Sequence, residues 1–416
     1  MLEGPLSPLY RLIGRHLEAA GTTVHRINLC PGDKVAWGFS AATSYRGRKR
    51  DWPAFVSAFL DEHPVDALLM HSERRPYHLE AAHEARTRGI AVYVSELGYL
   101  RPDWMTLECN GNSVDSLFPT DPAAIKAIAK DAPAVDPGVL FPRERLLETR
   151  DDLLNALPNV FLWFFYPHYR AHGLYHPFVA YARFLWREAQ KGQRDRAAQK
   201  VRARLKSPFF VFAMQTDTDF QIRSNSQFED MKEALGTVFR SFKAAADPEM
   251  RIIVKKHPGD LGPVHWAAAV PALAAEAGLE GRVHFVDGLA MEVWCRDAEG
   301  LVTVNSSAGL DGLKLGRPTL TLSPAVYDVP GLTHQGGLDG FWTAPQAPDP
   351  ALYDAFQRAL AASIQVRGTI YNRAGTKAAA SAIATRILEG RVGVPGAEVG
   401  PPPRYKRARA LGIRNT

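Results

Sequence analysis

Residues 65–104 read VDALLMHSERRPYHLEAAHEARTRGIAVYVSELGYLRPDW, and two short apolar runs in this stretch enclose a helical pattern. The runs 65–70 and 90–94 are typical of buried strands, and residues 77–89 predict a helix that ends at Gly89. A strand, a helix and a second strand of these lengths predict a parallel βαβ unit. The polar residues that follow each run are therefore expected at one edge of a sheet.

The same alternation continues on both sides of this stretch. Before it, we expect a strand at 23–29 and helices at 10–20 and 52–63. After residue 206, the predicted strands are 208–214, 251–255, 283–286, 301–304 and 319–322. The predicted helices there are 228–246, 266–277, one from residue 308, 351–366 and 376–388. The fold class is therefore α/β, with two Rossmann-like domains.

Composition and length agree with a folded chain of two domains. The 416 residues carry 50 Lys and Arg against 44 Asp and Glu, a net charge of +6, and 46% are hydrophobic. The three isolated cysteines, Cys30, Cys109 and Cys295, exclude a disulfide framework and a Cys-rich zinc module. No signal peptide and no apolar run of ~18 residues stand out, so we expect a cytoplasmic protein. Motifs of dinucleotide dehydrogenases, P-loop enzymes, zinc proteases and α/β hydrolases are absent.

We expect five segments along the chain. They are a Rossmann-like domain at 1–120, a helical insert or linker with aromatic and basic residues at 121–206, a second Rossmann-like domain at 207–343, helices at 344–394 and a disordered basic tail at 395–416.

Polar clusters follow both strands of the first βαβ unit. Glu96 follows the strand 90–94, Gly98 permits a tight turn, and Arg101 offers a partner for an anion. The alternative is an ion pair between Glu96 and Arg101 that only holds the loop. Residues 71–78, which include Arg75, predict anion binding before a helix. The alternative here is that Glu73 caps the helix or pairs with the arginines, and that His78 is only an exposed helix residue.

Two further clusters lie in the second domain. Pro258 ends the strand 251–255 and keeps His257 at the sheet edge, where its imidazole and the charge of Lys256 suit a phosphate. Asn305, Ser306 and Ser307 follow the strand 301–304 and precede a helix, as in an anion site or in a plain helix cap. A His-Pro and a Ser-Ser at two strand ends of one domain predict contact with one nucleotide.

Seven short motifs are spread over most of the chain. They are GPLSP at 4–8, YRG at 45–47, RPYH at 75–78, GYLRPDW at 98–104, KHP at 256–258, NSS at 305–307 and YDVPGLTHQG at 327–336. Together they resemble the bacterial capsule polysaccharide synthesis and export family of the KpsS type. The resemblance implies a GT-B glycosyltransferase with two Rossmann-like domains facing a cleft. The domain 1–120 would then take the acceptor and 207–343 the nucleotide sugar.

The resemblance also implies the reaction and the roles of site residues. Kdo would pass from CMP-β-Kdo, with retention, to a (lyso)phosphatidylglycerol-type lipid and initiate the linker of a capsule polysaccharide. Related transferases carry an acidic residue directly before the glycine, whereas this chain has Leu97 there and its carboxylate, Glu96, one position earlier. By the resemblance, Glu96 would be the nucleophile or a base. His257 would assist catalysis and bind the donor with Lys256, Pro258, Gln215, Asn305, Ser306, Ser307, Arg75 and Arg101. Acceptor or loop roles would fall to Gly98, Tyr99, Tyr77 and His78.

Two rival functions stay open at this point. One is a transferase for another CMP-nonulosonate such as sialic acid, because both donors share CMP and a 2-keto acid carboxylate. The other is a non-catalytic export or scaffold protein. We expect no cofactor, no metal and no nucleic acid, and as partners CMP-Kdo, an anionic lipid and other capsule assembly enzymes.

A membrane contact is predicted from the middle of the chain. The aromatic run 163–166 precedes a basic stretch at 183–206 and suits peripheral binding to an anionic inner membrane. The alternative is an interdomain core with a solvated basic side.

Overall fold

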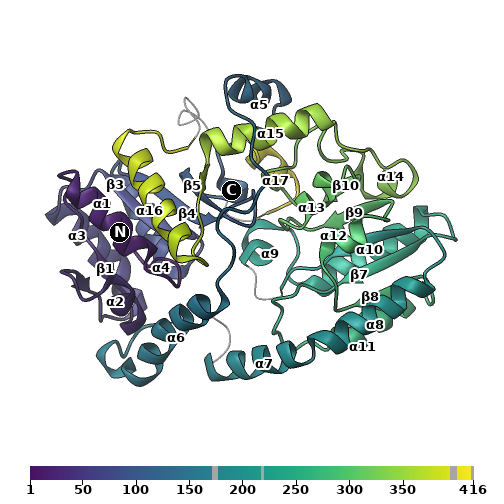
Figure 1. Cartoon of the computed structure of the whole chain (residues 1–416), viewed down its shortest axis with the longest axis horizontal. Coiled ribbons are helices and arrows are strands. Elements are labelled where there is room, and N and C mark those ends of the chain that lie inside the picture. The colour runs from purple at the N-terminus through teal and green to yellow at the C-terminus, as the bar shows by residue number, and fades with distance from the viewer. Residues whose placement is uncertain (171–176, 217–219, 394–400, 414–416) are drawn as a thin grey trace. The chain divides into compact units, whose positions relative to one another are not determined.

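The computed structural model describes residues 1–170, 177–216, 220–393 and 401–413. The chain folds into two compact units (Figure 1). Unit 1 comprises Met1–Phe118, Ile128–His172 and Gln357–Pro402, and unit 2 comprises Pro119–Ala127, Gly173–Phe356 and Pro403–Thr416. Each unit has its own sheet and core, which confirms the α/β class and the two Rossmann-like units of which a GT-B enzyme consists. The cleft between them stays a prediction.

The sheet of unit 2 is fully parallel. Its spatial order is β10-β9-β6-β7-β8, with β6 (Phe209–Ala213), β7 (Arg251–Lys255), β8 (Val283–Val286), β9 (Gly300–Thr303) and β10 (Thr319–Thr321). Counted within the unit, this is the Rossmann order 3-2-1-4-5, in which the direction of winding reverses between β6 and β9. All five strands were predicted from their apolar runs.

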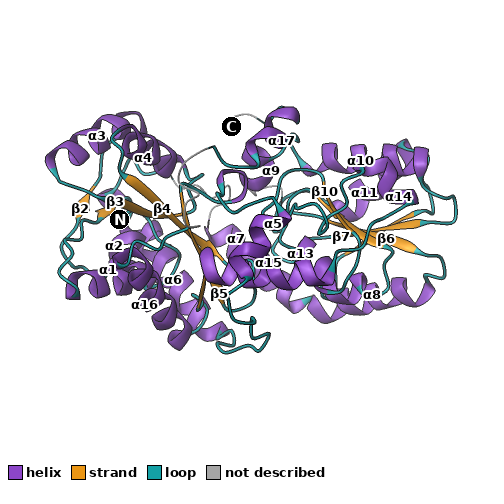
Figure 2. Cartoon of the chain, turned by 90° about the horizontal axis from the view of Figure 1, so that it is seen from above, coloured by secondary structure: helices purple, strands orange, loops and turns teal. Residues whose placement is uncertain are grey.

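Strand β6 shows why an unbroken apolar run predicted this sheet. Its residues FFVFA are buried throughout, because helices cover both faces (Figure 2). Phe210 and Phe212 pack with α10 and α11, while Val211 and Ala213 pack on the other face with Trp294. The helices of this unit are α7 (Pro177–Ala189), α8 (Lys191–Arg204), α9 (Phe220–Asn225), α10 (Met231–Ala245), α11 (Trp266–Glu276), α12 (Met291–Cys295), α13 (Gly309–Lys314), α14 (Gly337–Thr343) and α17 (Tyr405–Ala410).

The main sheet of unit 1 is mixed, which differs from the parallel sheet expected there. Its order is β11-β5-β4-β3, with β3 (Ala67–His71), β4 (Ala91–Leu97), β5 (Trp104–Cys109) and β11 (Gln365–Arg367). Only β3 and β4 are parallel, as predicted. Strand β5 returns antiparallel to β4, and β11 pairs with β5 in the region where a helix was expected to continue to residue 366. The buried polar residues Thr106 and Glu108 hid the strand character of β5.

Helices cover both faces of this sheet as well. Leu68 and Val94 pack with α3 and α4, whereas Leu69 and Met105 pack with α1 and α16. The elements are α1 (Leu9–Ala19), β1 (Ile27–Asn28), α2 (Pro31–Trp37), β2 (Thr43–Ser44), η1 (Lys49–Asp51), α3 (Trp52–Glu62), α4 (Pro76–Thr87), η2 (Ser113–Asp115), α6 (Arg145–Phe161), η3 (Trp163–Phe165) and α16 (Arg373–Leu388). Helices α5 (Pro122–Ala129) and α15 (Pro350–Ser363) each contain a boundary between the units.

The predicted segments follow the units only in part. The expected insert 121–206 is helical, but its residues are divided between the two units. The expected C-terminal helices include α16, which packs against α1 and therefore belongs to unit 1. Sequence spacing does not reveal such long-range packing.

The prediction of a disordered tail at 395–416 is wrong for the part that the structure describes, since residues 405–410 form α17. Residues 394–400 and 414–416 lie outside the described residues. Arg404 is buried and donates to the backbone oxygens of Ala325 and Val326 at 2.9 and 2.8 Å. Arg407 forms an ion pair with Asp328. These contacts hold the helix on the loop that carries the motif 327–336.

Replacing Arg404 should destabilise unit 2. In Arg404→Ala the two carbonyls lose a buried charged donor, and we expect the free energy of unfolding to fall by about 2 kcal/mol. Urea denaturation of both proteins measures this difference. Lys406→Ala is the matched control, because Lys406 is exposed on the same helix. Equal losses in both variants would contradict an anchoring role for Arg404.

Candidate active site

Unit 2 gathers its predicted residues at the carboxyl edge of the sheet. Ala213, Lys255 and Thr303 lie in one register row across β7, β6 and β9. Gln215, His257 and Asn305 each stand two residues beyond that row. This edge, beside the reversal between β6 and β9, is where sheets of this topology bind ligands.

Two amide side chains join the loops that follow β6 and β9, the strands between which the direction of winding reverses. Gln215 Nε2 donates to Asn305 Oδ1 at 2.9 Å, and Gln215 Oε1 accepts the backbone N–H of Asn305 at 3.1 Å. Asn305 Nδ2 also donates to the backbone oxygen of Asn225 at 3.1 Å. Both amides are buried, so they fix the two strand ends relative to each other. Their contacts indicate a positioning role for these two predicted donor-binding residues.

His257 has a defined tautomer in its neutral form. Its Nδ1 accepts the backbone N–H of Gly259 at 3.1 Å, which leaves the proton of a neutral ring on Nε2. The preceding residue, Lys256, directly follows β7, and its Nζ lies 3.5 Å from Asp260 Oδ2. Pro258 is exposed directly after these two residues. The loop thus holds an N–H donor and an ammonium group at the end of β7, as a phosphate site requires.

The Ser-Ser pair lies in a tight turn before α13. Ser306 Oγ accepts the backbone N–H of Ala308 at 3.2 Å, which is a contact within the turn. The N-cap residue of α13 is Ala308, and no side chain caps this helix, so the capping alternative does not apply to Ser306. The Tyr327 hydroxyl donates to the backbone oxygen of Ser306, and a Cβ at Gly309 would meet that hydroxyl at 2.3 Å. Ser307 is half-buried beside it. The close approach of Tyr327 explains the glycine that follows the serines.

In unit 1 the structure places Glu96 beside a histidine. His71 ends β3 in register with Ser95 of β4. Its Nε2 lies 3.6 Å from Glu96 Oε1, and its Nδ1 lies 3.1 Å from Ser95 Oγ. The hydroxyl of Tyr10 continues this chain at 2.9 Å from Ser95 Oγ. His71 was part of the polar cluster recognised after the first strand, but only the strand register shows that it meets Glu96.

The carboxyl group of Glu96 has an electrostatic environment suited to chemistry. Burial raises its pKa, while the Leu97 N–H, Arg75, Arg101 and Ser72 oppose the rise. The side chain still keeps 36% of its surface exposed. A partly desolvated but accessible carboxylate with adjacent cations is typical of nucleophiles and general bases.

The two arginines predicted to bind the donor differ in their surroundings. Arg101 is exposed, and its Nε donates to the backbone oxygen of Gly98 at 3.4 Å. Arg75 is mostly buried, with its Nη1 3.1 Å from Glu3 Oε1. An acidic residue thus neutralises Arg75, but it is Glu3 and not Glu73, the residue that the alternative named. Arg101 has the more accessible guanidinium for an anion.

Other residues of the cluster at 71–78 belong to the core. Glu73 and Arg74 are buried, and Arg74 forms an ion pair with Asp115. Burial and the nearby Asp115 raise the pKa of Glu73 to about 7. Tyr77 packs against Trp52 and Tyr169, and His78 is fully buried with Nδ1 donating to the backbone oxygen of Ser72 at 2.8 Å. The burial of Tyr77 and His78 fits packing rather than contact with an acceptor, and His78 is not the exposed residue that the alternative assumed.

Gly98 and Tyr99 shape the turn between β4 and β5. Gln365 of β11 accepts the backbone N–H of Tyr99 at 2.9 Å through its Oε1. A Cβ at Gly98 would lie 2.5 Å from the backbone oxygen of Trp104 and 2.6 Å from Gln365 Oε1. The turn therefore requires glycine because three strands approach each other at this point.

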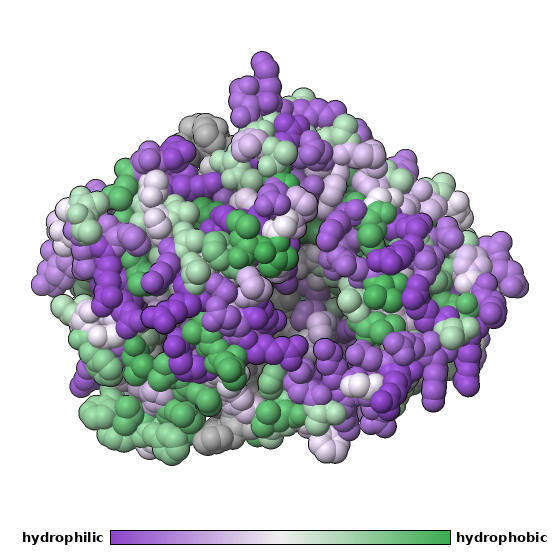
Figure 3. Space-filling view, in the orientation of Figure 1, coloured by the Kyte–Doolittle hydropathy of each residue, from purple (hydrophilic) through white to green (hydrophobic). Residues whose placement is uncertain are grey.

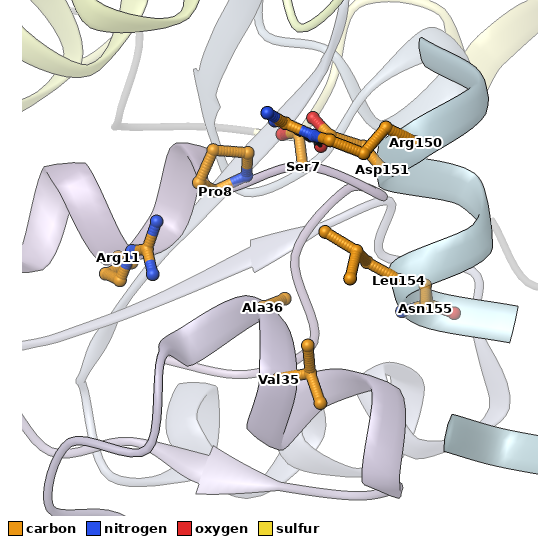
Figure 4. A pocket seen from close by; sticks show the side chains of 9 residues that line it. All are labelled: Ser7, Pro8, Arg11, Val35, Ala36, Arg150, Asp151, Leu154 and Asn155. Atoms are coloured by element: carbon orange, nitrogen blue, oxygen red, sulfur yellow. Dashed lines mark hydrogen bonds and ion pairs between the residues drawn. The ribbon is translucent and has the colours of Figure 1, made fainter. Parts of the chain in front are cut away.

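No group of three or more His, Cys, Asp or Glu side chains gathers as a metal site within the part of the chain that the structure describes. A cavity of about 100 Å³ lies in unit 1 between α1, α2 and α6, and none of the predicted site residues lines it (Figure 4).

Two Rossmann-like units, one with Glu96 and the other with Lys256 and His257 near strand ends, are the units of which a GT-B glycosyltransferase consists. Residues 66–371 match the family described as capsule polysaccharide biosynthesis protein, and the chain belongs to this family. It is 28% identical over 384 residues to the capsule polysaccharide export protein KpsS of Escherichia coli, covering 89% of this chain and 96% of that one. It is 27% identical over 388 residues to the capsule polysaccharide modification protein LipB of Neisseria meningitidis, covering 90% and 91%. These findings confirm the family resemblance.

One solved structure that covers most of this chain has a lower sequence identity than these two relatives. The β-Kdo 2,7-transferase KpsC of Thermosulfurimonas dismutans is 13% identical, with a TM-score of 0.44 and 94% of this chain and 99% of that chain covered.

Substituting Gly98 should disturb the turn that follows Glu96. We expect Gly98→Ala to lower the free energy of unfolding by roughly 1–3 kcal/mol, because the added methyl group meets backbone atoms that cannot move aside. Chemical denaturation measures the loss. Gly192→Ala is the control, since nothing lies within 4 Å of a Cβ at that helical position. A variant as stable as the wild type would show that the three strands can separate here.

Proposed function

We propose that this protein is a glycosyltransferase that moves Kdo from CMP-β-Kdo, with retention, to a (lyso)phosphatidylglycerol-type lipid. The lipid-linked sugar would start the linker of a capsule polysaccharide. Membership of the capsule polysaccharide biosynthesis family supports the pathway. The observation that carries the proposal is the placement of His257 at the carboxyl edge of a sheet with the Rossmann strand order. Its Nδ1 accepts the backbone N–H of Gly259, so the neutral ring carries its proton on Nε2.

The donor side of the proposal rests on unit 2. CMP leaves the sugar as a phosphate monoester, so negative charge grows on its phosphate as the glycosidic bond breaks. An Nε2–H donor on His257, the ammonium of Lys256 and the turn at Ser306 and Ser307 would stabilise that charge. The Gln215–Asn305 amide pair would keep these strand ends in place. This electrostatic role is worth most where water is excluded.

Retention can proceed by two displacements on Glu96. In the first, a Glu96 oxygen attacks the anomeric carbon, the bond to the CMP phosphate oxygen breaks, and CMP departs with the electron pair. In the second, the acceptor hydroxyl attacks the same carbon, the ester bond to Glu96 breaks, and the carboxylate is restored. The hydroxyl proton then needs a base. His71 lies 3.6 Å from Glu96 and would accept it.

The sugar carboxylate of the donor needs a cation of its own. Arg101 would bind it, because its guanidinium is exposed and a planar fork matches a carboxylate. Arg75 is paired with Glu3 and would act less directly, through its charge, which favours the ionised form of Glu96.

Two rival functions are separable by one assay. A transferase for another CMP-nonulosonate would release CMP from CMP-sialic acid more readily than from CMP-Kdo. An export or scaffold protein would release CMP from neither donor. CMP release should be measured with both donors, with (lyso)phosphatidylglycerol and free glycans as competing acceptors. The proposal expects release from CMP-Kdo that rises with the lipid.

The proposed site of action is the cytoplasmic face of the inner membrane, with other capsule assembly enzymes as partners. Within the described ranges, no helix has the length and apolar character needed to cross a bilayer. Contact with a lipid acceptor would therefore be made by surface residues.

Removing the His257 ring should impair use of the donor. We expect His257→Ala to lower kcat roughly a hundredfold, which corresponds to about 3 kcal/mol, because one charge-directed donor is lost in the transition state. CMP release under saturating donor measures it. His265→Ala is the control, since His265 is exposed before α11 in the same unit. A folded His257→Ala enzyme with full activity would rule out the role.

Neutralising Glu96 should abolish transfer. Glu96→Gln keeps the size of the side chain but removes the charge needed for attack or for proton abstraction. Glu80→Gln on the exposed surface of α4 should be unaffected. Since the pKa of Glu96 is raised, wild-type kcat/KM should fall with decreasing pH already above the ordinary carboxyl range. Intact-mass spectrometry with CMP-Kdo tests the covalent step, and an adduct on another carboxylate would exclude Glu96 as nucleophile.

A further inference from the structure

Helix α6 of unit 1 presents leucines to solvent along one stripe. Leu146, Leu153, Leu157 and Phe161 follow each other at helical spacing, and all are exposed, with Leu146 at 89% and Phe161 at 64%. Leu154 lies beside them. Figure 3 shows hydrophobic side chains gathered over this region at the lower left. Helices on protein surfaces normally carry polar residues on this side.

Three polar side chains of α6 lie on its other side, toward the protein. Asp151, Asn155 and Asn159 recur every four residues. Asn159 Oδ1 accepts the backbone N–H of Gly32 in α2 at 2.8 Å, and Asn159 Nδ2 donates to Asn155 Oδ1 at 3.2 Å. A Cβ at Gly32 would lie 2.7 Å from the backbone oxygen of Asn155. The helix is thus held on α2 through its polar side, which leaves the leucine stripe outward.

Three aromatic rings extend the stripe beyond the end of the helix. Trp163, Phe164 and Phe165 form η3 and are 60%, 55% and 49% exposed. The next residue, Tyr166, is buried, and its hydroxyl donates to Ser44 Oγ at 2.8 Å. The exposed rings are therefore fixed in place by an anchored neighbour.

Positive charge lies at the base of the stripe. The cavity of about 100 Å³ in Figure 4 is lined by Arg11, by Arg150 and Asp151, and by Leu154 of the stripe region. Arg150 pairs with Asp151 at 2.6 Å, so Arg11 supplies the excess of one positive charge. Arg150 and Leu154 also line a shallow apolar hollow with Leu153, Leu157, Pro158, Phe161 and Leu162.

We propose that the leucine stripe of α6 and the rings of η3 form a surface that inserts into the interfacial layer of an anionic phospholipid membrane, with headgroup phosphate at Arg11. The inference rests on the proposed action at a membrane. Hydrocarbon would cover the leucines, the aromatic rings would lie at the headgroup level, and Arg11 would face the phosphates. An apolar stripe beside a basic cavity matches the two parts of a phospholipid, its hydrocarbon chains and its phosphate.

The basic stretch at 183–206 is less suited to this role. Arg187 and Arg194 both pair with Asp287, and Arg202 pairs with Asp297. Arg183 donates to the backbone oxygen of Leu261 at 2.8 Å. Several cations predicted to meet lipid are therefore engaged within unit 2.

Vesicle co-sedimentation tests the surface with matched variants. The test variant is Leu153→Gln, Leu157→Gln and Phe161→Gln, and the control variant is Phe184→Gln, Leu185→Gln and Trp186→Gln on α7. Both remove three exposed apolar side chains. With vesicles of equal phosphatidylglycerol and phosphatidylcholine, we expect at least a tenfold loss of binding for the test variant and wild-type binding for the control. Arg11→Gln should reduce the preference for phosphatidylglycerol over pure phosphatidylcholine vesicles.

Several outcomes would overturn the proposal. They are equal binding by wild type and test variant, loss of binding in the α7 variant alone, or no binding of the wild type to either vesicle. A wild-type dimer that the test variant converts to monomer, without vesicle binding, would assign the stripe to a second copy of this chain. If the test variant misfolds, quenching by brominated phosphatidylglycerol should be weaker in Trp163→Phe than in the wild type. Vesicle binding without CMP release would contradict the proposed reaction and leave this inference standing.

Discussion

The hydrogen-bonded amides of Gln215 and Asn305 close the point at which the strand order of unit 2 reverses, and the candidate phosphate site depends on this closure. Parallel strands bring their carboxyl ends to one edge, but they leave the loops beyond that edge unspecified. The two amides tie the loop after β6 to the loop after β9 in a buried setting. Because a buried amide without a partner is costly, each side chain selects the conformation of the other loop. His257 and the serines are then presented on a fixed base.

In unit 1 the position of Glu96 is fixed by the register of β3 and β4 and by the close contact of Gly98 with neighbouring strands. The parallel pairing of β3 and β4 sets His71 opposite Ser95 and so brings its ring to Glu96. Beyond Glu96, the contact of Gly98 with β5 and β11 determines where the strand must turn. Burial then adjusts the acidity of the carboxyl group without sealing it from solvent. One carboxylate thus has both a defined position and a proton partner.

Much of this arrangement was predictable from sequence, because apolar runs in parallel sheets are nearly continuous. The strands at 251–255 and 283–286 were predicted with the bounds that the structure has. The strands β5 and β11 were missed, since their polar residues, such as Thr106 and Gln365, are buried by pairing that local patterns do not encode. The order of residues also predicted strand-end clusters at Glu96 and His257. It did not distinguish the surroundings of the two arginines. Arg75 pairs with Glu3 near the start of the sequence, whereas Arg101 is exposed and donates to the backbone oxygen of Gly98. The distinction requires tertiary contacts.

The division of the chain between the units has a consequence for its synthesis. Unit 1 receives β11 and α16 from residues 357–402, and unit 2 receives α17 from residues after 403. A nascent chain that has emerged to residue 356 therefore holds most of both units but can complete neither. The β5 edge of unit 1 stays open until β11 is made, and the loop after β10 stays without Arg404. Both units are therefore completed only by residues made after residue 356, and a chimaera that exchanges one whole unit needs a crossover at each of the five boundaries between the units.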